Sequence, residues 1–354
     1  MLLEGTQRRS AAEVAQHIDQ YGADLITRVH PDNWSITLVT LSQHLVPMLE
    51  LLSELLLMPA FDEQRLAHRK HLKQQSLKVD AQKNDKIARK KFREVLFQAA
   101  HPYGKQLTAE AIEAVTVDQL RQFYRTKLFA NGRIFLSGQV HDQHLQAIQH
   151  HLQGIPTHEV DNQSIVPAQG AVPTHAKLPA KGDLQAALHV GKVLFARTHP
   201  DYAAMFFVNA LLGGYFGSRL MRNIREDKGY TYGIHARIIA LKHTSYLHIA
   251  TEVIRESLEA TCIEIRREIE TLQSVPVPQR ELQTLRHYLL GTFLAHVSDP
   301  FSIMEKFKAA QLHGLGQGHY TQLLHTIRGI DEKQVMEMAN RYLAVGQLSQ
   351  VVVG

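Results

Sequence analysis

Apolar residues at helical spacing open the chain. After Ser10, Val14 and Ile18 lie four residues apart, so they would share one face of a helix. Ser10 is followed three residues later by Glu13, the capping-box pattern that starts a helix. Gly22 is the residue at which such a helix commonly ends. The first element is therefore predicted to be an amphipathic helix that ends at a glycine.

The pattern then shortens to a period of two. Trp34, Ile36 and Leu38 alternate with polar residues, as in a strand with one buried face. The rest of the first half predicts strands over 25–29 and 34–41, an apolar helix over 44–58, a polar helical stretch over 62–98, two short helices, a strand over 133–137 and a helix over 143–152.

The second half shows the same kinds of segment. It predicts strands over 186–195, 232–241, 245–253 and 348–353, helices over 200–212, 219–226, 256–272, 279–296 and 302–313, and two more helices before the last strand. Ser218, which follows Gly217, is expected to cap the helix over 219–226.

The two halves repeat one order of elements: helix, glycine, strand, tight turn, strand, long helix. The stretch 154–182 separates them, and its prolines and glycines interrupt any periodicity, as in an interdomain linker. We therefore predict an α+β fold of two related lobes over 1–153 and 183–354.

Composition agrees with a folded two-domain protein. The chain has 354 residues, 44% of them apolar, and a formal net charge of +5, which argues against disorder. No membrane-spanning helix is expected, because Glu50 and Glu54 interrupt the most apolar stretch. No signal-peptide pattern is visible. The single cysteine, Cys262, fits an apolar helix pattern and excludes a disulfide framework.

The 22 histidines make a metal site the first chemistry to test. Zinc hydrolases place two histidines on adjacent turns of a helix beside a glutamate, as His-x-x-Glu-His or its inverse. Neither pattern occurs. His68 and His71 have Arg69 and Lys70 between them, and the pair at 141 and 144 has no suitably spaced carboxylate. No metal ligands are predicted in this chain.

Two further features have ordinary explanations. The glycine-rich stretch 213–218 follows a helix and lacks the P-loop lysine, so a turn between helices is expected rather than a phosphate loop. Residues 68–93 hold ten Lys or Arg against two Asp. A solvated helix explains this better than nucleic-acid binding, since no nucleic-acid motif accompanies it. A basic wall facing an acidic peptide or partner also remains open.

The segment 214–234 carries a specific resemblance. It is similar to the second domain of the insulinase/pitrilysin family of zinc peptidases, which includes the mitochondrial processing peptidase. In that family the helix after a small-residue loop carries an arginine, and a tyrosine follows seven residues later on a strand. Arg225 and Tyr232 have this spacing. The resemblance implies that both contact the scissile carbonyl of a peptide. The alternative is a helix C-terminal charge and a strand core residue.

The first half resembles the same family. The stretch 1–6 is similar to the residues that follow the family's zinc motif, and His101-Pro102-Tyr103-Gly104 also fits. The resemblance implies the processing-peptidase-like fold of two α/β-sandwich lobes, with the first lobe truncated at its N-terminus. The zinc motif His-x-x-Glu-His would lie before Met1. The third ligand, a glutamate, is replaced near Gln74-Gln75-Ser76 by residues that are poor zinc ligands.

The resemblance implies three alternatives for function. In the first, the chain is a non-catalytic subunit that holds peptide and supplies Arg225 and Tyr232 to a zinc-bearing homologous partner, so zinc is expected in the partner and none in this chain. In the second, it is an active zinc peptidase whose zinc motif is missing from this sequence. In the third, it is a peptide-binding scaffold. A homodimer is the alternative assembly. The expected location is cytoplasmic, or periplasmic if a signal has been lost.

Overall fold

A computed structural model describes residues 1–156, 172–182 and 184–354 and divides the chain into two compact units. Unit 1 comprises Met1–Lys78 and Leu107–Ser164, and unit 2 comprises Val79–Gln106 and Ile165–Gly354. The predicted α+β fold is confirmed, because sheets and helices occur in both units. The predicted linker over 154–182 lies partly outside the described residues.

Unit 1 begins with the predicted capping box. Ser10 and Glu13 satisfy each other's backbone amides and start α1 (Ala11–Gln20), and Gly22 follows it with a φ of +56°. The unit continues with β1 (Asp24–Val29), β2 (Trp34–Val39), η1 (Ser42–His44), α2 (Leu45–Leu57), α3 (Glu63–Asp80), α5 (Ala109–Glu113), α6 (Val117–Phe123), η2 (Tyr124–Leu128) and α7 (Asp142–Leu152).

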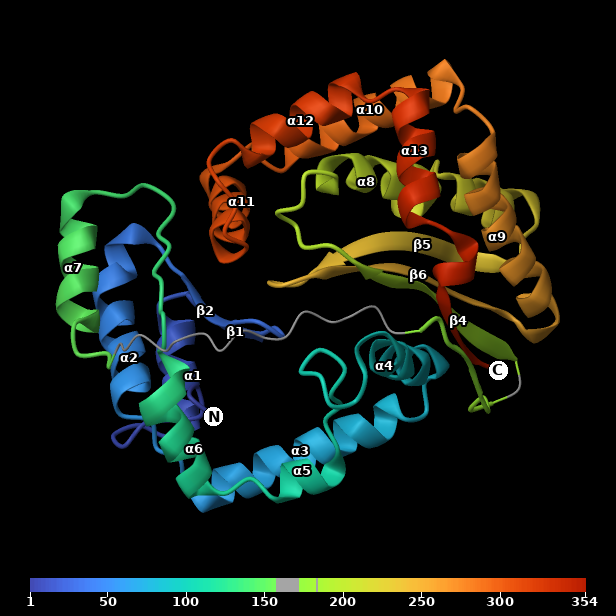
Figure 1. Cartoon of the computed structure of the whole chain (residues 1–354). Coiled ribbons are helices and arrows are strands. Elements are labelled where there is room, and N and C mark those ends of the chain that lie inside the picture. Colours follow the sequence, from blue (N-terminus) through green and yellow to red (C-terminus); the bar gives the residue numbers. More distant parts are fainter. Residues whose placement is uncertain (157–171, 183) are drawn as a thin grey trace. The chain divides into compact units, whose positions relative to one another are not determined.

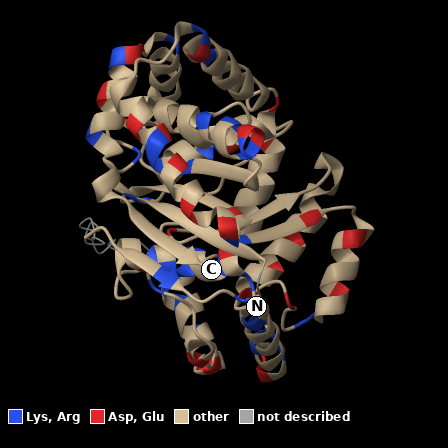
Figure 2. Cartoon of the chain, turned by 90° about the vertical axis from the view of Figure 1, so that its right-hand side faces the viewer, with Lys and Arg blue, Asp and Glu red and all other residues tan. Residues whose placement is uncertain are grey.

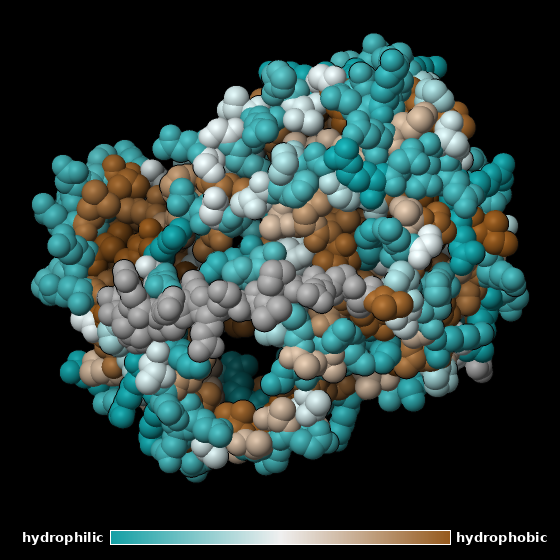
Figure 3. Space-filling view, in the orientation of Figure 1, coloured by the Kyte–Doolittle hydropathy of each residue, from teal (hydrophilic) through white to brown (hydrophobic). Residues whose placement is uncertain are grey.

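The core of unit 1 lies between α1, α2 and a two-stranded antiparallel sheet. Val14, Met48, Leu51 and Leu55 are buried there. Strand β1 is largely open to solvent, with Val29 84% exposed. Figure 3 also shows apolar residues at the surface over α7 and α2. Two strands alone bury little surface, so much of the sheet's apolar side stays open.

The predicted strand over 133–137 is wrong. These residues form no strand, although Ile134 and Leu136 have strand-like spacing. Among the described residues of unit 1, the only sheet is the β1–β2 pair, and its ladder does not include this segment. An alternating pattern becomes a strand only where a neighbouring strand accepts its hydrogen bonds.

Unit 2 is built on a five-stranded sheet in the order β3-β7-β4-β6-β5 (Figure 1). Its strands are β3 (His175–Leu178), β4 (Gln185–Leu194), β5 (Thr231–Ala240), β6 (Ser245–Ile254) and β7 (Ser349–Val353). Strand β3 was not predicted, because it falls in the segment interpreted as linker. It lies parallel to β7, so the end of that segment is part of the second sheet.

One face of this sheet is covered by a layer of helices (Figure 1). The layer and its connections comprise α8 (Tyr202–Asn209), η3 (Ala210–Gly214), η4 (Met221–Asp227), η5 (Arg255–Ser257), α9 (Leu258–Ser274), α10 (Gln279–Ala295), α11 (Pro300–Leu312), α12 (His319–Gly329), α13 (Glu332–Tyr342) and η6 (Val345–Gln347). The largest apolar cluster fills the space between sheet and helices, with Met205, Phe207, Leu247 and Ile249 fully buried.

The opposite face of the sheet is covered by α4 (Asn84–Phe97) (Figure 1). Its buried side chains Ala88, Phe92 and Leu96 repeat at helical spacing and pack with strand residues. The helix predicted over 62–98 is thus broken into α3 and α4. The segment 79–106 packs with unit 2, although the sequence analysis placed it in the first lobe, because its apolar stripe finds its core there.

The order of elements predicted to repeat is present in both units. In unit 1 it runs α1, Gly22, β1, β2, α2, and in unit 2 it runs η4, Gly229, β5, β6, α9. Both glycines have a positive φ, +56° and +65°, a conformation that glycine adopts without a steric cost. Each therefore turns the chain from a helix into the following strand.

Charged residues of both signs lie interspersed on the helices visible in Figure 2. In the basic stretch of α3, Lys70 lies 3.8 Å from a carboxylate oxygen of Glu113, and Arg69 pairs with Glu4. Within the described ranges, no helix combines the length and the apolar character needed to cross a membrane. The absence of nucleic-acid binding stays a prediction.

Candidate functional site

The helical turn that carries Arg225 is held in place by a buried ion pair and by a side-chain hydrogen bond. Arg219 is 6% exposed and donates from Nε and Nη2 to the two carboxylate oxygens of Glu281, at 2.9 Å each. Asn223 donates to Glu264 at 2.9 Å, tying the turn to α9. A planar guanidinium fork matched to a carboxylate is the stronger kind of ion pair. The backbone under Arg225 is therefore fixed to α9 and α10.

Arg225 itself is half-buried in the last turn of η4. Its guanidinium carbon lies 4.8 Å from the centroid of the Phe216 ring, a cation–π contact. The helix position agrees with a C-terminal charge favoured by the helix dipole. The contact with Phe216 also orients the guanidinium of Arg225, which the helix dipole alone would not do. It links this arginine to the glycine-rich stretch 213–218.

Tyr232 is 92% exposed, so the alternative of a strand core residue is wrong. It lies where the β5–β6 register shifts, between Thr231 and Ile234. The Thr231 hydroxyl donates to the carbonyl of Glu252 at 2.7 Å, which fixes the irregular backbone. Strand bulges commonly re-aim a side chain beside a binding site. The side chain of Tyr232 thus points outward from an irregular part of β5, whose backbone is fixed by the Thr231 hydrogen bond.

In the described part of the chain, no hydrogen bond joins Arg225 to Tyr232 or occupies the Tyr232 hydroxyl. Both side chains carry hydrogen-bond donors, a guanidinium and a phenol. Each stands on a backbone fixed by other contacts. Two such preorganised donors are suited to an oxygen atom that gains negative charge. Their contact with a scissile carbonyl stays a prediction.

The predicted side-chain cap at Ser218 is wrong. Its hydroxyl oxygen is buried without a hydrogen-bond partner, and its backbone carbonyl instead accepts from the amide of Arg222 at 2.9 Å. The helix therefore begins without a side-chain cap, and the Arg219–Glu281 pair lies at that end.

Gly213 is required by close packing. A Cβ atom there would lie 2.7 Å from the backbone nitrogen of Ala236 and 2.8 Å from its Cβ. We expect Gly213→Ala to destabilise the protein by about 1–3 kcal/mol, the usual cost of overpacking a core. Urea denaturation would measure this, with Gly233→Ala as the control, because a Cβ at that glycine meets no atom within 4 Å. Equal stability of the two variants would contradict the packing argument.

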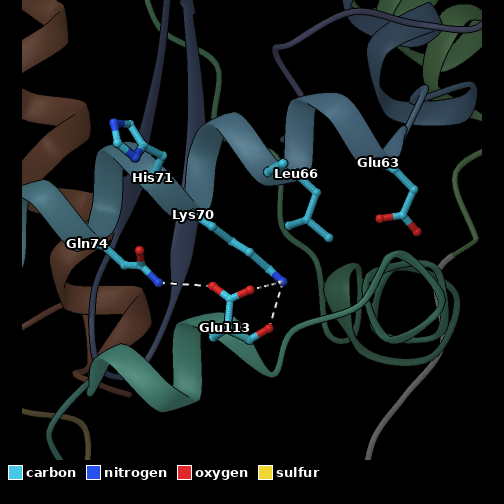
Figure 4. A pocket seen from close by; sticks show the side chains of 7 residues that line it. Glu63, Leu66, Lys70, His71, Gln74 and Glu113 are labelled. Carbon is cyan, nitrogen blue, oxygen red and sulfur yellow. Dashed lines mark hydrogen bonds and ion pairs between the residues drawn. The ribbon is translucent and has the colours of Figure 1, made fainter.

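The residues expected at the place of the third zinc ligand, Gln74-Gln75-Ser76, lie on α3, and Figure 4 shows Gln74. Gln74 donates to a carboxylate oxygen of Glu113 at 3.0 Å, and Lys70 donates to the Glu113 carbonyl at 2.6 Å. These residues line a cavity of about 180 Å³ together with Glu63, Leu66, Ala67 and His71. In this cavity the carboxylate of Glu113 therefore already lies beside the amide of Gln74 and the ammonium group of Lys70.

These residues do not fit zinc. A catalytic zinc needs three ligands from histidine, carboxylate or cysteine. Gln75 is hydrogen-bonded to His71 at 2.8 Å, and the ammonium of Lys70 would repel a cation beside it. Within residues 1–156, 172–182 and 184–354, no three histidine, cysteine or acidic side chains are arranged to hold a metal ion.

One polar cluster was missed in the sequence. Asp85 on α4 lies 3.2 Å from Nε2 of His189, whose Nδ1 is hydrogen-bonded to Nε2 of His248 at 2.7 Å. The hydrogen bond from His189 is the main cause that lowers the Asp85 pKa below its ordinary value. Burial, followed by the charges of His189 and Arg89, lowers the pKa of His248 to about 3. No spacing reveals this cluster, since its members come from three separate elements.

Comparisons with known proteins point to one family. A family model described as insulinase, peptidase family M16, matches residues 1–109. A second, described as the peptidase M16 inactive domain, matches residues 114–289. Together the two matches cover most of the chain.

Relatives and solved structures agree with these matches. An "Uncharacterized zinc protease YmxG" of Bacillus subtilis is 21% identical over 86% of this chain and 75% of its own length. A "Non-peptidase homolog YmxG" of Helicobacter pylori is 24% identical over 82% of this chain and 68% of its own. The crystal structure of a peptidase M16 inactive domain from Pseudomonas fluorescens has a TM-score of 0.90 at 24% identity, covering 100% of this chain and 86% of that one. That likeness shows a shared fold.

Proposed function

Because the chain belongs to the insulinase family of peptidases, M16, we propose that it is the non-catalytic subunit of a heterodimeric zinc endopeptidase. On this proposal it binds peptide substrates and presents Arg225 and Tyr232 to the active site of a zinc-bearing homologous partner. The match to the family's inactive-domain model and the name of the Helicobacter pylori relative support a non-catalytic member.

One observation carries the proposal. Tyr232 is presented outward on a strand irregularity, and Arg225 stands on an anchored turn, while amides of α3 stand where the resemblance predicts a ligand carboxylate. The chain thus has two hydrogen-bond donors for a developing oxyanion, but on α3 it lacks the carboxylate that would hold zinc. A protein with only the first of these can assist peptide hydrolysis but needs water activation from elsewhere.

In this role the two side chains would act on the peptide. The Arg225 guanidinium and the Tyr232 hydroxyl donate hydrogen bonds to the carbonyl oxygen of the scissile bond as it gains negative charge. Zinc in the partner would supply the activated water. Phe216 holds the guanidinium in one direction through its ring face, which reduces the freedom lost when substrate binds.

Mixing the chain with a zinc-bearing homologue tests the proposal. The purified chain is expected to contain no stoichiometric zinc and to leave a fluorescent peptide uncut. Adding a homologue that carries His-x-x-Glu-His, preferably one encoded beside this gene, should give a complex on size exclusion and peptidase activity above that of the homologue alone. Unchanged activity together with separate elution of the two proteins would overturn the proposal.

The name of the Bacillus subtilis relative favours a second candidate, an active zinc peptidase. It requires a His-x-x-Glu-His motif in the gene upstream of Met1. One equivalent of zinc and hydrolysis by the product of that longer gene, with no partner, would establish this candidate. Zinc-free protein that binds peptide but gains no activity with any homologue would instead support a peptide-binding scaffold.

A further inference from the structure

Three basic side chains lie near the end of β4 in unit 2, where the charge of Arg197 acts on the other two and Nζ of Lys306 lies 5.8 Å from the centroid of the Phe293 ring. Arg197 follows that strand, Lys306 lies on α11, and His319 begins α12. The ring of Tyr202 lies near two of them. The guanidinium carbon of Arg197 is 5.7 Å from the centroid of this ring, and the ring of His319 is 6.5 Å away. We call Arg197, Lys306, His319 and Tyr202 the basic cluster.

The basic cluster contains no balancing acid. None of its three basic side chains forms a salt bridge within the described residues. The nearby carboxylates are engaged elsewhere: Asp201 accepts from Arg341 at 2.9 Å and from Tyr342 at 2.5 Å, and Glu305 pairs with Lys308. Positive charge is therefore concentrated here without a counter-charge from the protein.

Burial and mutual repulsion both disfavour the charged forms of Lys306 and His319. Burial, followed by the charge of Arg197, lowers the pKa of Lys306 below its ordinary value. Burial, Arg197 and His313 likewise lower the pKa of His319. Groups with these shifts gain stability when a negative charge approaches, because the repulsion between them is relieved.

Two nitrogen atoms of the cluster are also left without partners. Nε of Arg197 and Nε2 of His319 are shielded from solvent, yet neither has a hydrogen-bond partner in the described structure. A buried polar group without a hydrogen bond costs about 1–3 kcal/mol, and such groups in native proteins point to an ion or water that completes them. All of the groups named here can donate.

We propose that the basic cluster binds a small oxyanion of the phosphate class. A phosphate group offers several acceptor oxygens and close to two negative charges at neutral pH, which matches donors that arrive from three elements. The guanidinium fork of Arg197 suits its geometry, and Lys306 supplies a second full charge. The phenol and the imidazole complete the hydrogen bonds.

This site is separate from Arg225 and Tyr232 and does not depend on the proposed peptidase role. Strands β4 and β5 are both antiparallel to β6, so they run in the same direction. Tyr232 lies at the beginning of β5, whereas Arg197 follows the end of β4. A ten-residue strand spans roughly 30 Å, so the two sites lie at opposite ends of the sheet.

Calorimetric titration with inorganic phosphate tests the proposal on the full chain, with sodium chloride at matched ionic strength as the reference. We expect saturable binding that weakens at least tenfold in Arg197→Gln and in Lys306→Met. Arg280→Gln on α10 is the matched control, because this exposed arginine forms no salt bridge in the described residues, and it should bind as the parent does. If Arg197→Gln fails to fold, Lys306→Met decides the result.

A second readout follows the proton on His319. Phosphate should raise the pKa of the His319 ring measured by NMR, with His319→Gln identifying its signal. A phosphoserine peptide in place of inorganic phosphate tells whether the phosphoryl group is taken free or on a chain, and binding of either supports the site. Equal binding of acetate, or equal phosphate binding by the parent and both cluster variants, would overturn the assignment.

Discussion

Arg225→Ala is expected to reduce kcat of the mixed peptidase by about 10²- to 10³-fold, the usual effect of removing one preorganised oxyanion donor. The side chain stands on a turn fixed by the Arg219–Glu281 pair, and its guanidinium is oriented by Phe216. The alanine variant should keep the fold, because Arg225 forms no salt bridge in the described residues. KM should change less than kcat, since the donor acts on the charge of the transition state.

Arg222→Ala is the matched control for this measurement. Arg222 lies one turn earlier on the same helical segment and is exposed, so its removal changes charge equally. Initial rates of the mixture with each variant would separate a positional effect from a general loss of positive charge. Equal loss in both variants, or no loss with Arg225→Ala, would contradict the assigned role.

Most elements of the fold could be predicted from the sequence because they depend on local patterns. The capping box at Ser10 and Glu13 and the glycine at position 22 mark one helix from end to end. The prediction of a strand over 133–137 was wrong because a strand also needs a neighbouring strand to pair with. The local pattern of residues does not show whether such a neighbour exists. Strand β3 was not predicted because it lies in a proline-rich stretch that was interpreted as a linker. Its parallel partner, β7, is distant in the sequence.

The candidate site could be predicted only in part. Arg225 and Tyr232 stand in one continuous segment, so their spacing was visible in the sequence. The lack of a glutamate at Gln74-Gln75-Ser76, where the resemblance predicts one, was visible there too. The exposure of Tyr232 could not, because the register shift that presents it depends on pairing with β6. The Asp85–His189–His248 cluster joins two histidines 59 positions apart to an aspartate more than 100 positions before them, so only the structure reveals it.

That cluster lies where α4 packs on the sheet. Phe92 of α4 stacks on His248 with ring centroids 5.2 Å apart and an interplanar angle of 29°. Asn84, at the beginning of the helix, donates to the carbonyl of Gln185 at 2.8 Å and accepts from the amide of Lys181 at 2.8 Å. The segment Val79–Gln106, which contains α4, belongs to unit 2, and the chain before and after this segment belongs to unit 1. Loss of this packing would therefore release the segment 79–106 from the sheet of unit 2.

We expect acid to weaken the packing of α4. The His248 pKa is about 3 in the folded chain against an ordinary value of 6.5. Between these values the unfolded chain binds a proton that the folded chain does not, so stability falls as pH falls, by about 1.4 kcal/mol per pH unit for one proton. Protonation of Asp85, whose pKa is also lowered, adds to the loss below about pH 4.

Hydrogen exchange at α4 and β6 between pH 7 and pH 5, corrected for the intrinsic pH dependence of exchange, would measure this loss. In His248→Gln the pH dependence of stability should lose the contribution of about one proton, because the glutamine amide does not titrate. The charged and titratable groups that influence His248 are Asp85 and Arg89 from α4, His189 from β4 and His235 from β5, and all of them remain in the variant. His287→Gln, at an exposed position on α10, should leave the slope unchanged. A parent-like slope in His248→Gln would show that the acid sensitivity arises outside this buried histidine.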